Sequence, residues 1–177
     1  MTRKIVVMGS SCSGKTTVAA RLAERLGAPH VELDALHHGP NWQVATADEL
    51  RTKLDTALAG AEGWVVDGNY MAKLGTYLTD RADTIVWLDL PLRTLLLRMW
   101  ERTRVRIRDG VELWSAGNRE SWRSLLLSWD GLLWYTLRTH YRRRREWPPR
   151  FEGRPVVRLR SQSEVDAWLA VQTRRPR

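Results

Sequence analysis

Near its N-terminus the chain reads Lys4-Ile5-Val6-Val7-Met8-Gly9-Ser10-Ser11-Cys12-Ser13-Gly14-Lys15-Thr16-Thr17. An apolar, β-branched run therefore leads into a loop bounded by two glycines. Apolar residues at helical spacing follow at once: Val18, Ala19, Leu22, Ala23 and Leu26. Strand, G-x-x-x-x-G-K-T loop and helix, in that order, predict a phosphate-binding P-loop, the Walker A motif.

The residue types of this loop suit a nucleoside triphosphate. Gly9 and Gly14 let backbone N–H groups turn toward phosphate oxygens, and the next helix directs its positive end at the same anion. Lys15 is expected to reach the β- and γ-phosphates, and the Thr16 hydroxyl to bind Mg²⁺. The predicted ATP contacts are Gly9, Ser10, Ser11, Cys12, Ser13, Gly14, Lys15, Thr16 and Thr17.

Short apolar strands alternate with helical patterns along the whole chain. The predicted strands cover residues 4–8, 30–34, 64–67, 84–90 and 155–159, and the main helical patterns cover 15–26, 46–58, 92–108, 119–129, 131–145 and 163–171. This alternation predicts one α/β domain over residues 1–177, with a five-stranded parallel sheet covered on both faces. We expect an acceptor-binding region at about 35–60 and a lid at about 103–128.

Composition narrows the class of protein. No apolar run approaches the length that spans a membrane, and no secretory signal precedes the first strand. Cys12 is the only cysteine, which excludes an intrachain disulfide and favours a cytoplasmic location. The formal net charge of +9 favours polyanionic partners, either phosphates in a site or nucleic acid.

Ligands of parallel sheets bind beyond the carboxyl ends of the strands, so acids there are candidate site residues. Asp34 follows the second predicted strand and is expected to meet an acceptor group. Asp67 ends the third strand and is a candidate Mg²⁺ ligand, with a turn aspartate before Gly68 as the alternative. For Asp89, after the fourth strand, a helix cap is favoured over a ligand.

Arginines recur every four residues on the helical pattern after the fourth strand. Arg98, Arg102 and Arg106 form one stripe, and phosphoryl transfer needs positive charge around the migrating group. A solvated helix face is the alternative. Arg119 is a second candidate for substrate contact, and His37 and Trp42 are candidates in the loop after Asp34.

Several of these motifs together resemble the adenylate kinase-like group of small P-loop kinases. The shared features are the P-loop, the acid after the second strand, Trp64-Val65-Val66-Asp67-Gly68, Asp89-Leu90-Pro91, and the helix with Arg98 and Arg102. Val65-Val66-Asp67-Gly68-Asn69-Tyr70 looks most like bacterial proteins labelled DNA topology modulation protein or adenylate kinase-related.

The resemblance implies roles for individual residues. Arg98 would stack on the ATP adenine, and Arg102 would contact the transferring phosphates. Asp34 would bind or activate the acceptor hydroxyl, and Asp67 would hold Mg²⁺ through water. Asn69 and Tyr70 would lie at the substrate.

Two departures from this group leave the acceptor open. Adenylate kinases follow the Asp-Gly with Phe-Pro-Arg, whose arginine grips the AMP phosphate, whereas Asn69-Tyr70-Met71 stands here. The acceptor-phosphate arginine after the second strand is also absent. A nucleotide, a nucleoside and another small hydroxyl compound all remain as candidate acceptors.

A nucleic-acid-associated regulator that binds ATP is the alternative function. It is less favoured, and its support is the net charge together with the arginine-rich run Arg138, Arg142, Arg143, Arg144, Arg145 and Arg150.

Overall fold

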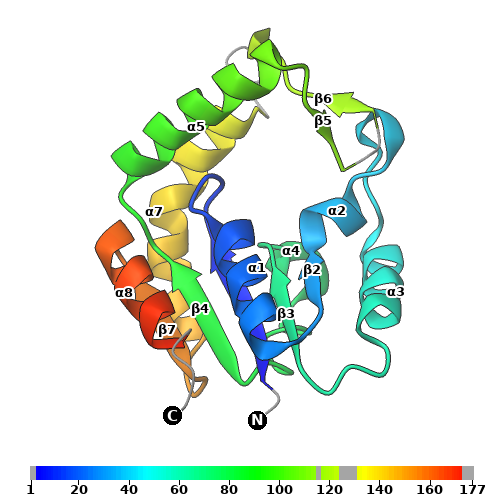
Figure 1. The fold of residues 1–177 in the computed structure, drawn as a ribbon, viewed down its shortest axis with the longest axis vertical. Coiled ribbons are helices and arrows are strands. Elements are labelled where there is room, and N and C mark those ends of the chain that lie inside the picture. The colour runs from blue at the N-terminus through cyan, green and yellow to red at the C-terminus, as the bar shows by residue number, and fades with distance from the viewer. Residues whose placement is uncertain (1–2, 115–116, 124–130, 173–177) are drawn as a thin grey trace.

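A computed structural model describes residues 3–114, 117–123 and 131–172. Its centre is a parallel sheet of five strands in the order β2-β3-β1-β4-β7, with helices on both faces (Figure 1). The strands are β1 (Lys4–Gly9), β2 (His30–Glu32), β3 (Trp64–Asp67), β4 (Thr84–Leu88) and β7 (Val156–Leu159). The predicted fold class, an α/β P-loop fold with a five-stranded parallel sheet, is confirmed.

The helices run mostly as the sequence patterns predict. They are α1 (Lys15–Leu26), α2 (Leu33–His37), α3 (Ala47–Leu58), α4 (Met71–Leu74), α5 (Leu92–Arg108), α7 (Leu132–Arg150) and α8 (Gln162–Gln172), with a 3₁₀ turn at Pro40–Trp42. The predicted helix over 119–129 falls mostly outside the described residues. Among the described residues, no helix has the length and apolar character needed to cross a membrane.

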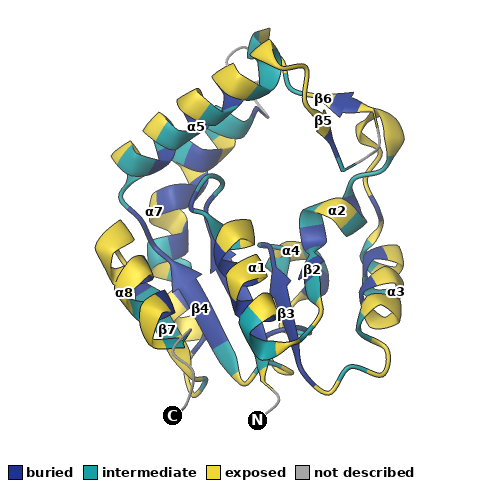
Figure 2. Ribbon diagram, in the orientation of Figure 1, coloured by how far each residue is buried: buried dark blue, intermediate teal, exposed yellow. Residues whose placement is uncertain are grey.

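Alternating strand residues fill two separate cores, one on each face of the sheet. Figure 2 shows that the central strands β1, β3 and β4 are mostly buried. On one face Val6, Met8 and Trp87 pack with residues of α3 and α7. On the other face the intervening strand residues pack with α1, α5 and α8. Period-two alternation along each strand explains this division, because successive side chains point to opposite faces. The two cores hold the carboxyl ends of β1, β3 and β4 at one edge.

The second strand is shorter than predicted. β2 ends at Glu32, and α2 begins at Leu33, so Asp34 lies in the first turn of a helix rather than on a strand. Period-two alternation therefore does not place Glu32 and Asp34 on one side. Leu33 is buried, at 1% exposure, in the core beneath α3, and this burial turns the chain at that point.

The helix α7 continues through Pro148 and Pro149 to Arg150, although the sequence predicts an end near Arg145. Both prolines fall in its last turn, so the helix loses the two hydrogen bonds that backbone N–H groups at 148 and 149 would donate. Trp147 is 5% exposed and packs on Trp87 and Phe151, which fixes this turn against the sheet. Tertiary packing therefore overrides the local preference against helix before proline.

The segment for which the sequence predicts a lid contains a two-stranded antiparallel hairpin, β5 (Glu112–Leu113) and β6 (Asn118–Arg119). Figure 1 shows this hairpin at the far end of α5, beside the segment that follows α2. Asn118 joins the two regions: it accepts a hydrogen bond from the Trp42 backbone N–H at 2.9 Å and donates to the Gly39 carbonyl at 3.0 Å. Its side chain is buried, so the hairpin is fastened to the loop after α2.

Candidate active site

The P-loop runs from the end of β1 into α1, and its two glycines are required by geometry. A Cβ on Gly9 would stand 2.7 Å from the Leu88 carbonyl oxygen and 2.6 Å from Ser13 Oγ. Gly14 has φ +91°, in the left-handed region that favours glycine, immediately before the helix. The buried Ser13 Oγ has no hydrogen-bond partner. The loop therefore keeps the shape that the motif predicts.

Burial shifts the pKa values of two side chains in this loop, Lys15 and Cys12. Burial lowers the pKa of the Lys15 ammonium, although the negative charges of Asp34 and Asp67 oppose this shift. Lys15 Nζ donates to the Ser10 carbonyl at 3.2 Å. Burial raises the pKa of the Cys12 thiol despite nearby Arg102 and Lys15. Desolvation of the thiol therefore outweighs the positive charges near it.

Thr16 and Asp67 lie together, as the sequence predicts for a Mg²⁺ site. The Thr16 hydroxyl donates to Asp67 Oδ2 at 2.8 Å, and Asp67 is 2% exposed. The other carboxylate oxygen of Asp67, Oδ1, lies 2.9 Å from His30 Nε2. Sequence reasoning missed His30 because its contact with Asp67, 37 residues away, depends on how β2 pairs with β3. The carboxylate and hydroxyl oxygens are the hard ligands that Mg²⁺ prefers, so the residues fit this metal.

Asp34 meets Tyr70 on the other side of the loop. The Tyr70 hydroxyl donates to Asp34 Oδ1 at 2.7 Å, and burial together with the Asp34 charge raises the pKa of Tyr70. His37 packs against Tyr70 with ring centroids 4.8 Å apart. Burial lowers the pKa of His37 to about 4, so its imidazole is neutral at pH 7. We call Asp34, His37 and Tyr70 the acceptor side.

Asn69 is bonded to the P-loop rather than directed to open space. Its Oδ1 accepts the Gly9 backbone N–H at 3.0 Å, and its Nδ2 donates to the Gly9 carbonyl. Its side chain therefore ties the loop after β3 to the start of the P-loop. This arrangement gives Asn69 a supporting position, where the sequence suggested substrate contact.

Trp42 and Arg119 lie farther from the P-loop. Trp42 is 44% exposed and contacts Trp114 and His38 edge to face. Arg119 is exposed on β6, and its guanidinium lies beside Gly110 at the end of α5. The structure therefore does not bring Arg119 together with Asp34 and Lys15.

The arginine stripe of α5 divides into two parts. Arg98 lies at the P-loop, with Nη1 3.5 Å from the Ser13 carbonyl and Nη2 2.5 Å from Gln162 Oε1. Arg102 and Arg106 share Glu120, at 3.6 Å and 2.6 Å. The stripe is thus not a freely solvated face, and Arg98 is the member that reaches the loop in this conformation.

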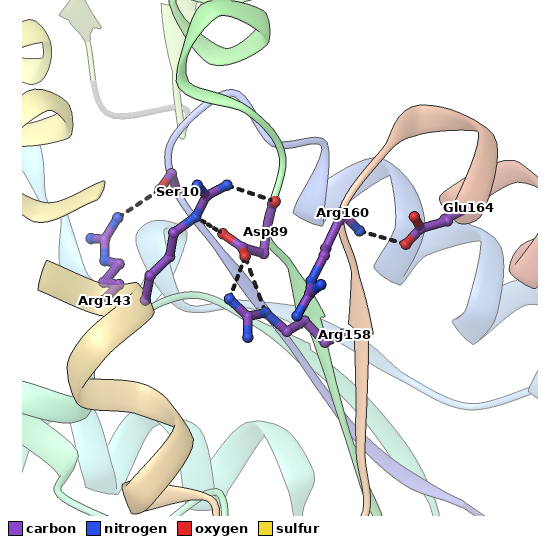
Figure 3. Close-up of polar contacts among 7 residues, drawn as sticks. Ser10, Asp89, Arg143, Arg158, Arg160 and Glu164 are labelled. Carbon is purple, nitrogen blue, oxygen red and sulfur yellow. Dashed lines mark hydrogen bonds and ion pairs between the residues drawn. The ribbon is translucent and has the colours of Figure 1, made fainter. Parts of the chain in front are cut away.

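A buried arginine that sequence reasoning did not place at the site comes from α7. Arg143 Nη1 donates to Ser10 Oγ at 3.0 Å (Figure 3). Its Nη2 donates to the Tyr135 hydroxyl, also at 3.0 Å. Arg143 is 7% exposed, and burial lowers its pKa. Both hydrogen-bond partners are neutral hydroxyls. A buried cation with neutral partners costs free energy, and an anionic ligand at the P-loop would compensate it.

The next residue along α7 behaves differently. Arg144 Nε donates to Asp89 Oδ1 at 2.7 Å, and Arg158 Nη2 donates to Asp89 Oδ2 at the same distance. In Figure 3 the Asp89 carboxylate points toward the Arg158 guanidinium. Asp89 is 6% exposed, and Pro91 stands at the N-cap of α5. The prediction that Asp89 caps this helix is therefore wrong: it joins α7 to β7.

Comparison with known proteins places this fold among small P-loop kinases. Solved structures that resemble the whole chain include a gluconokinase from Sinorhizobium meliloti, at 26% identity and TM-score 0.53 over 97% of this chain and 93% of that one. A sugar kinase from a Janibacter species matches at 20% identity and TM-score 0.52, over 96% of this chain and 94% of that one. A shikimate kinase from Acinetobacter baumannii matches at 18% identity and TM-score 0.55, over 97% and 91%.

A local sequence match agrees with these structures. A gluconokinase from Gluconobacter oxydans is 45% identical over 65 residues, which span 36% of this chain and 36% of that protein. No family model matches the chain. The chain therefore has the fold of small P-loop kinases and resembles gluconokinases in sequence over about a third of its length.

Proposed function

We propose that this protein is a Mg²⁺-dependent phosphotransferase that moves the γ-phosphoryl group of ATP to a hydroxyl of a small molecule. The observation that carries the proposal is that two acids act on the charge of Lys15. Asp67 accepts a hydrogen bond from Thr16, and Asp34 accepts one from Tyr70. Each of the three tasks thus has its own residues: Lys15 for phosphate binding, Thr16 and Asp67 for metal binding, and Asp34 for activation of the acceptor.

The reaction follows from these positions. The P-loop amides and Lys15 bind the β- and γ-phosphates. The oxygen of the acceptor hydroxyl attacks the γ-phosphorus, and Asp34 accepts the proton of that hydroxyl. The bond from the γ-phosphorus to the β-γ bridging oxygen breaks, and ADP leaves. Bound Mg²⁺ would be held by Thr16 and Asp67 and would neutralise charge on the phosphate oxygens. Arg98, Arg102 and Arg143 supply further positive charge around the transferring group.

The acceptor side favours a small polyhydroxyl compound. Tyr70 and the neutral His37 and His38 stand near Asp34, and side chains of this kind exchange hydrogen bonds with hydroxyl groups. The names of the similar proteins, gluconokinase, sugar kinase and shikimate kinase, support the same class. Gluconate and shikimate are therefore the first acceptors to test, followed by neutral sugars, nucleosides and AMP.

A screen of ADP release tests this proposal. Purified protein is incubated with Mg²⁺·ATP and each acceptor in turn, and ADP formation above the acceptor-free rate is measured. We expect one polyhydroxyl acceptor to raise the rate at least about tenfold, with Lys15→Ala as the negative control. Stimulation by AMP alone would instead support a nucleotide kinase. No stimulation by any hydroxyl compound would contradict the proposal.

The resemblance to proteins labelled DNA topology modulation protein, and the nucleic-acid alternative, stay predictions. The arginine-rich run that supports them is partly used inside the molecule, because Arg143 binds Ser10 and Arg144 binds Asp89. If the rest of the run bound a duplex through several phosphates, affinity would fall steeply between about 50 and 200 mM salt.

A further inference from the structure

Asp67 is held from two directions. Its Oδ2 accepts the Thr16 hydroxyl at 2.8 Å, and its Oδ1 lies 2.9 Å from His30 Nε2. The carboxylate is 2% exposed, so water supplies little of its hydrogen bonding. Among the described contacts, His30 is the partner of Oδ1. Loss of that donor would leave a buried carboxylate oxygen unsatisfied, which is costly.

The sheet register explains how a histidine at the start of β2 reaches this acid. Glu32 pairs with Asp67 and His30 pairs with Val65, so all four side chains share the face covered by α1. β2 is an edge strand, which leaves room beside His30. The imidazole extends along the strand and lines a cavity of about 500 Å³ with Thr16, Glu32 and Ala20.

We propose that His30 is a positioning residue for the metal site: its ring N–H donates to Asp67 Oδ1 and keeps Oδ2 turned toward Thr16. This inference rests on the proposed function, in which Thr16 and Asp67 hold Mg²⁺. A ligand carboxylate that keeps one orientation loses less freedom when the metal binds. Partners of this kind typically contribute 10–100-fold to metal affinity or activity.

The role predicts an effect on Mg²⁺ that is separate from nucleotide binding itself. Among the described hydrogen bonds His30 makes none to the P-loop, whereas Lys15 and Arg98 bond to loop carbonyls. Removing the imidazole donor should therefore weaken Mg²⁺-dependent ADP binding and leave metal-free ADP binding almost unchanged. If His30 only filled space, its substitution would destabilise the fold and would change the ADP affinities with and without Mg²⁺ by the same factor.

Equilibrium binding of ADP, measured in EDTA and across a Mg²⁺ titration, tests this. His30→Leu fills the space without a donor, and we expect its Mg²⁺ midpoint to rise about tenfold or more. His30→Gln places an amide N–H at similar reach and should recover most of the loss. Metal-free ADP affinity should stay within about twofold in both variants. Ala20→Leu, which alters the same cavity away from Asp67, is the control and should keep the wild-type midpoint.

The outcomes separate this inference from the proposed function. If the ADP affinity of the wild-type protein does not depend on Mg²⁺, the metal site is wrong, and both proposals fail with it. Wild-type Mg²⁺ dependence with an unchanged midpoint in His30→Leu would overturn the positioning role alone. If His30→Leu does not fold, His30→Asn replaces it, because its shorter amide stops before Asp67 and should show the same rise. Equal midpoints for His30→Asn and His30→Gln would also overturn the role.

Discussion

The phosphate-binding half and the acceptor half of the site are built in different ways. The phosphate-binding half is one continuous stretch, Gly9 to Thr17, with its own backbone geometry. The acceptor half combines α2, the segment after β3 and the loop that Asn118 fastens to the hairpin. The backbone shape of a continuous stretch is set by residues that are near one another in sequence, whereas an assembled half depends on contacts far apart in sequence.

The largest effect should follow from Lys15→Ala, at the centre of the continuous half. The substitution removes a charge that binds phosphates in both the ground state and the transition state. A single transition-state donor contributes about 10²–10³ in kcat, and lost binding adds to this, so kcat/KM should fall at least about 10⁴-fold. Thermal unfolding should remain near wild type. Wild-type turnover by a folded variant would remove the kinase proposal.

Asp34→Asn tests the assembled half. Asparagine keeps the shape and can still accept from Tyr70, but it cannot take a proton. We expect phosphoryl transfer to fall about 10³-fold, within the 10²–10⁴ range of general base catalysis, while ATP affinity with Mg²⁺ stays within a few-fold. If Asp34 were a metal ligand instead, Mg²⁺-dependent ATP binding would fall together with transfer.

Arg143→Ala asks whether the continuous half depends on a distant helix. Loss of a buried guanidinium beside Ser10 should lower kcat by about 10²-fold, since such a donor stabilises developing charge. Arg145→Ala, on the exposed side of α7, is the matched control and should stay within about twofold. Equal kcat values for the two variants would show that Arg143 is only part of the packing of α7.

Arg102→Ala and Arg98→Ala compare the two parts of the α5 stripe. Arg102 is paired with Glu120, and its charge acts on Cys12 of the P-loop, so its removal should lower kcat about tenfold. Arg98 touches the P-loop already and should chiefly raise the KM for ATP. Steady-state kinetics at several ATP concentrations separate the effects. Two small, equal changes would indicate a solvated face.

The smallest effect on activity should come from Asn118→Ala, which opens the contact between hairpin and acceptor loop. Two buried hydrogen bonds are lost, so the free energy of unfolding should fall by about 1–3 kcal/mol. The KM for the acceptor should rise a few-fold, with kcat little changed. Urea unfolding and steady-state kinetics measure both. Glu112→Ala, on the exposed strand of the same hairpin, should change stability by less than about 0.5 kcal/mol.

Sequence reasoning predicts local features well here. The P-loop and the β3 aspartate depend on neighbours within a few residues, and the structure has both. The position of Asp34 was harder, because the burial of Leu33 starts a helix where the apolar run suggests a strand. Pro148 likewise indicates a helix end, but α7 continues past it because Trp147 packs against the sheet.

Partners from distant segments could not be predicted. His30 reaches Asp67 because two strands pair in a particular register. Arg143 reaches Ser10 across 133 positions. A signal for Arg143 does exist in the sequence: Thr136, Thr139, His140, Arg143 and Trp147 recur every three or four residues and all are buried. That spacing indicates an inward face, which the surrounding arginines obscure.

The bond between Arg143 and Ser10 has a consequence for synthesis. The P-loop leaves the ribosome first, but Arg143 follows 133 residues later, and β7, which Arg158 fastens to Asp89, comes later still. A nascent chain that carries the complete Walker A motif therefore lacks the guanidinium beside it until most of the chain has emerged. We expect N-terminal fragments that stop before α7 to bind nucleotide poorly, so tight nucleotide binding would report that α7 has been made.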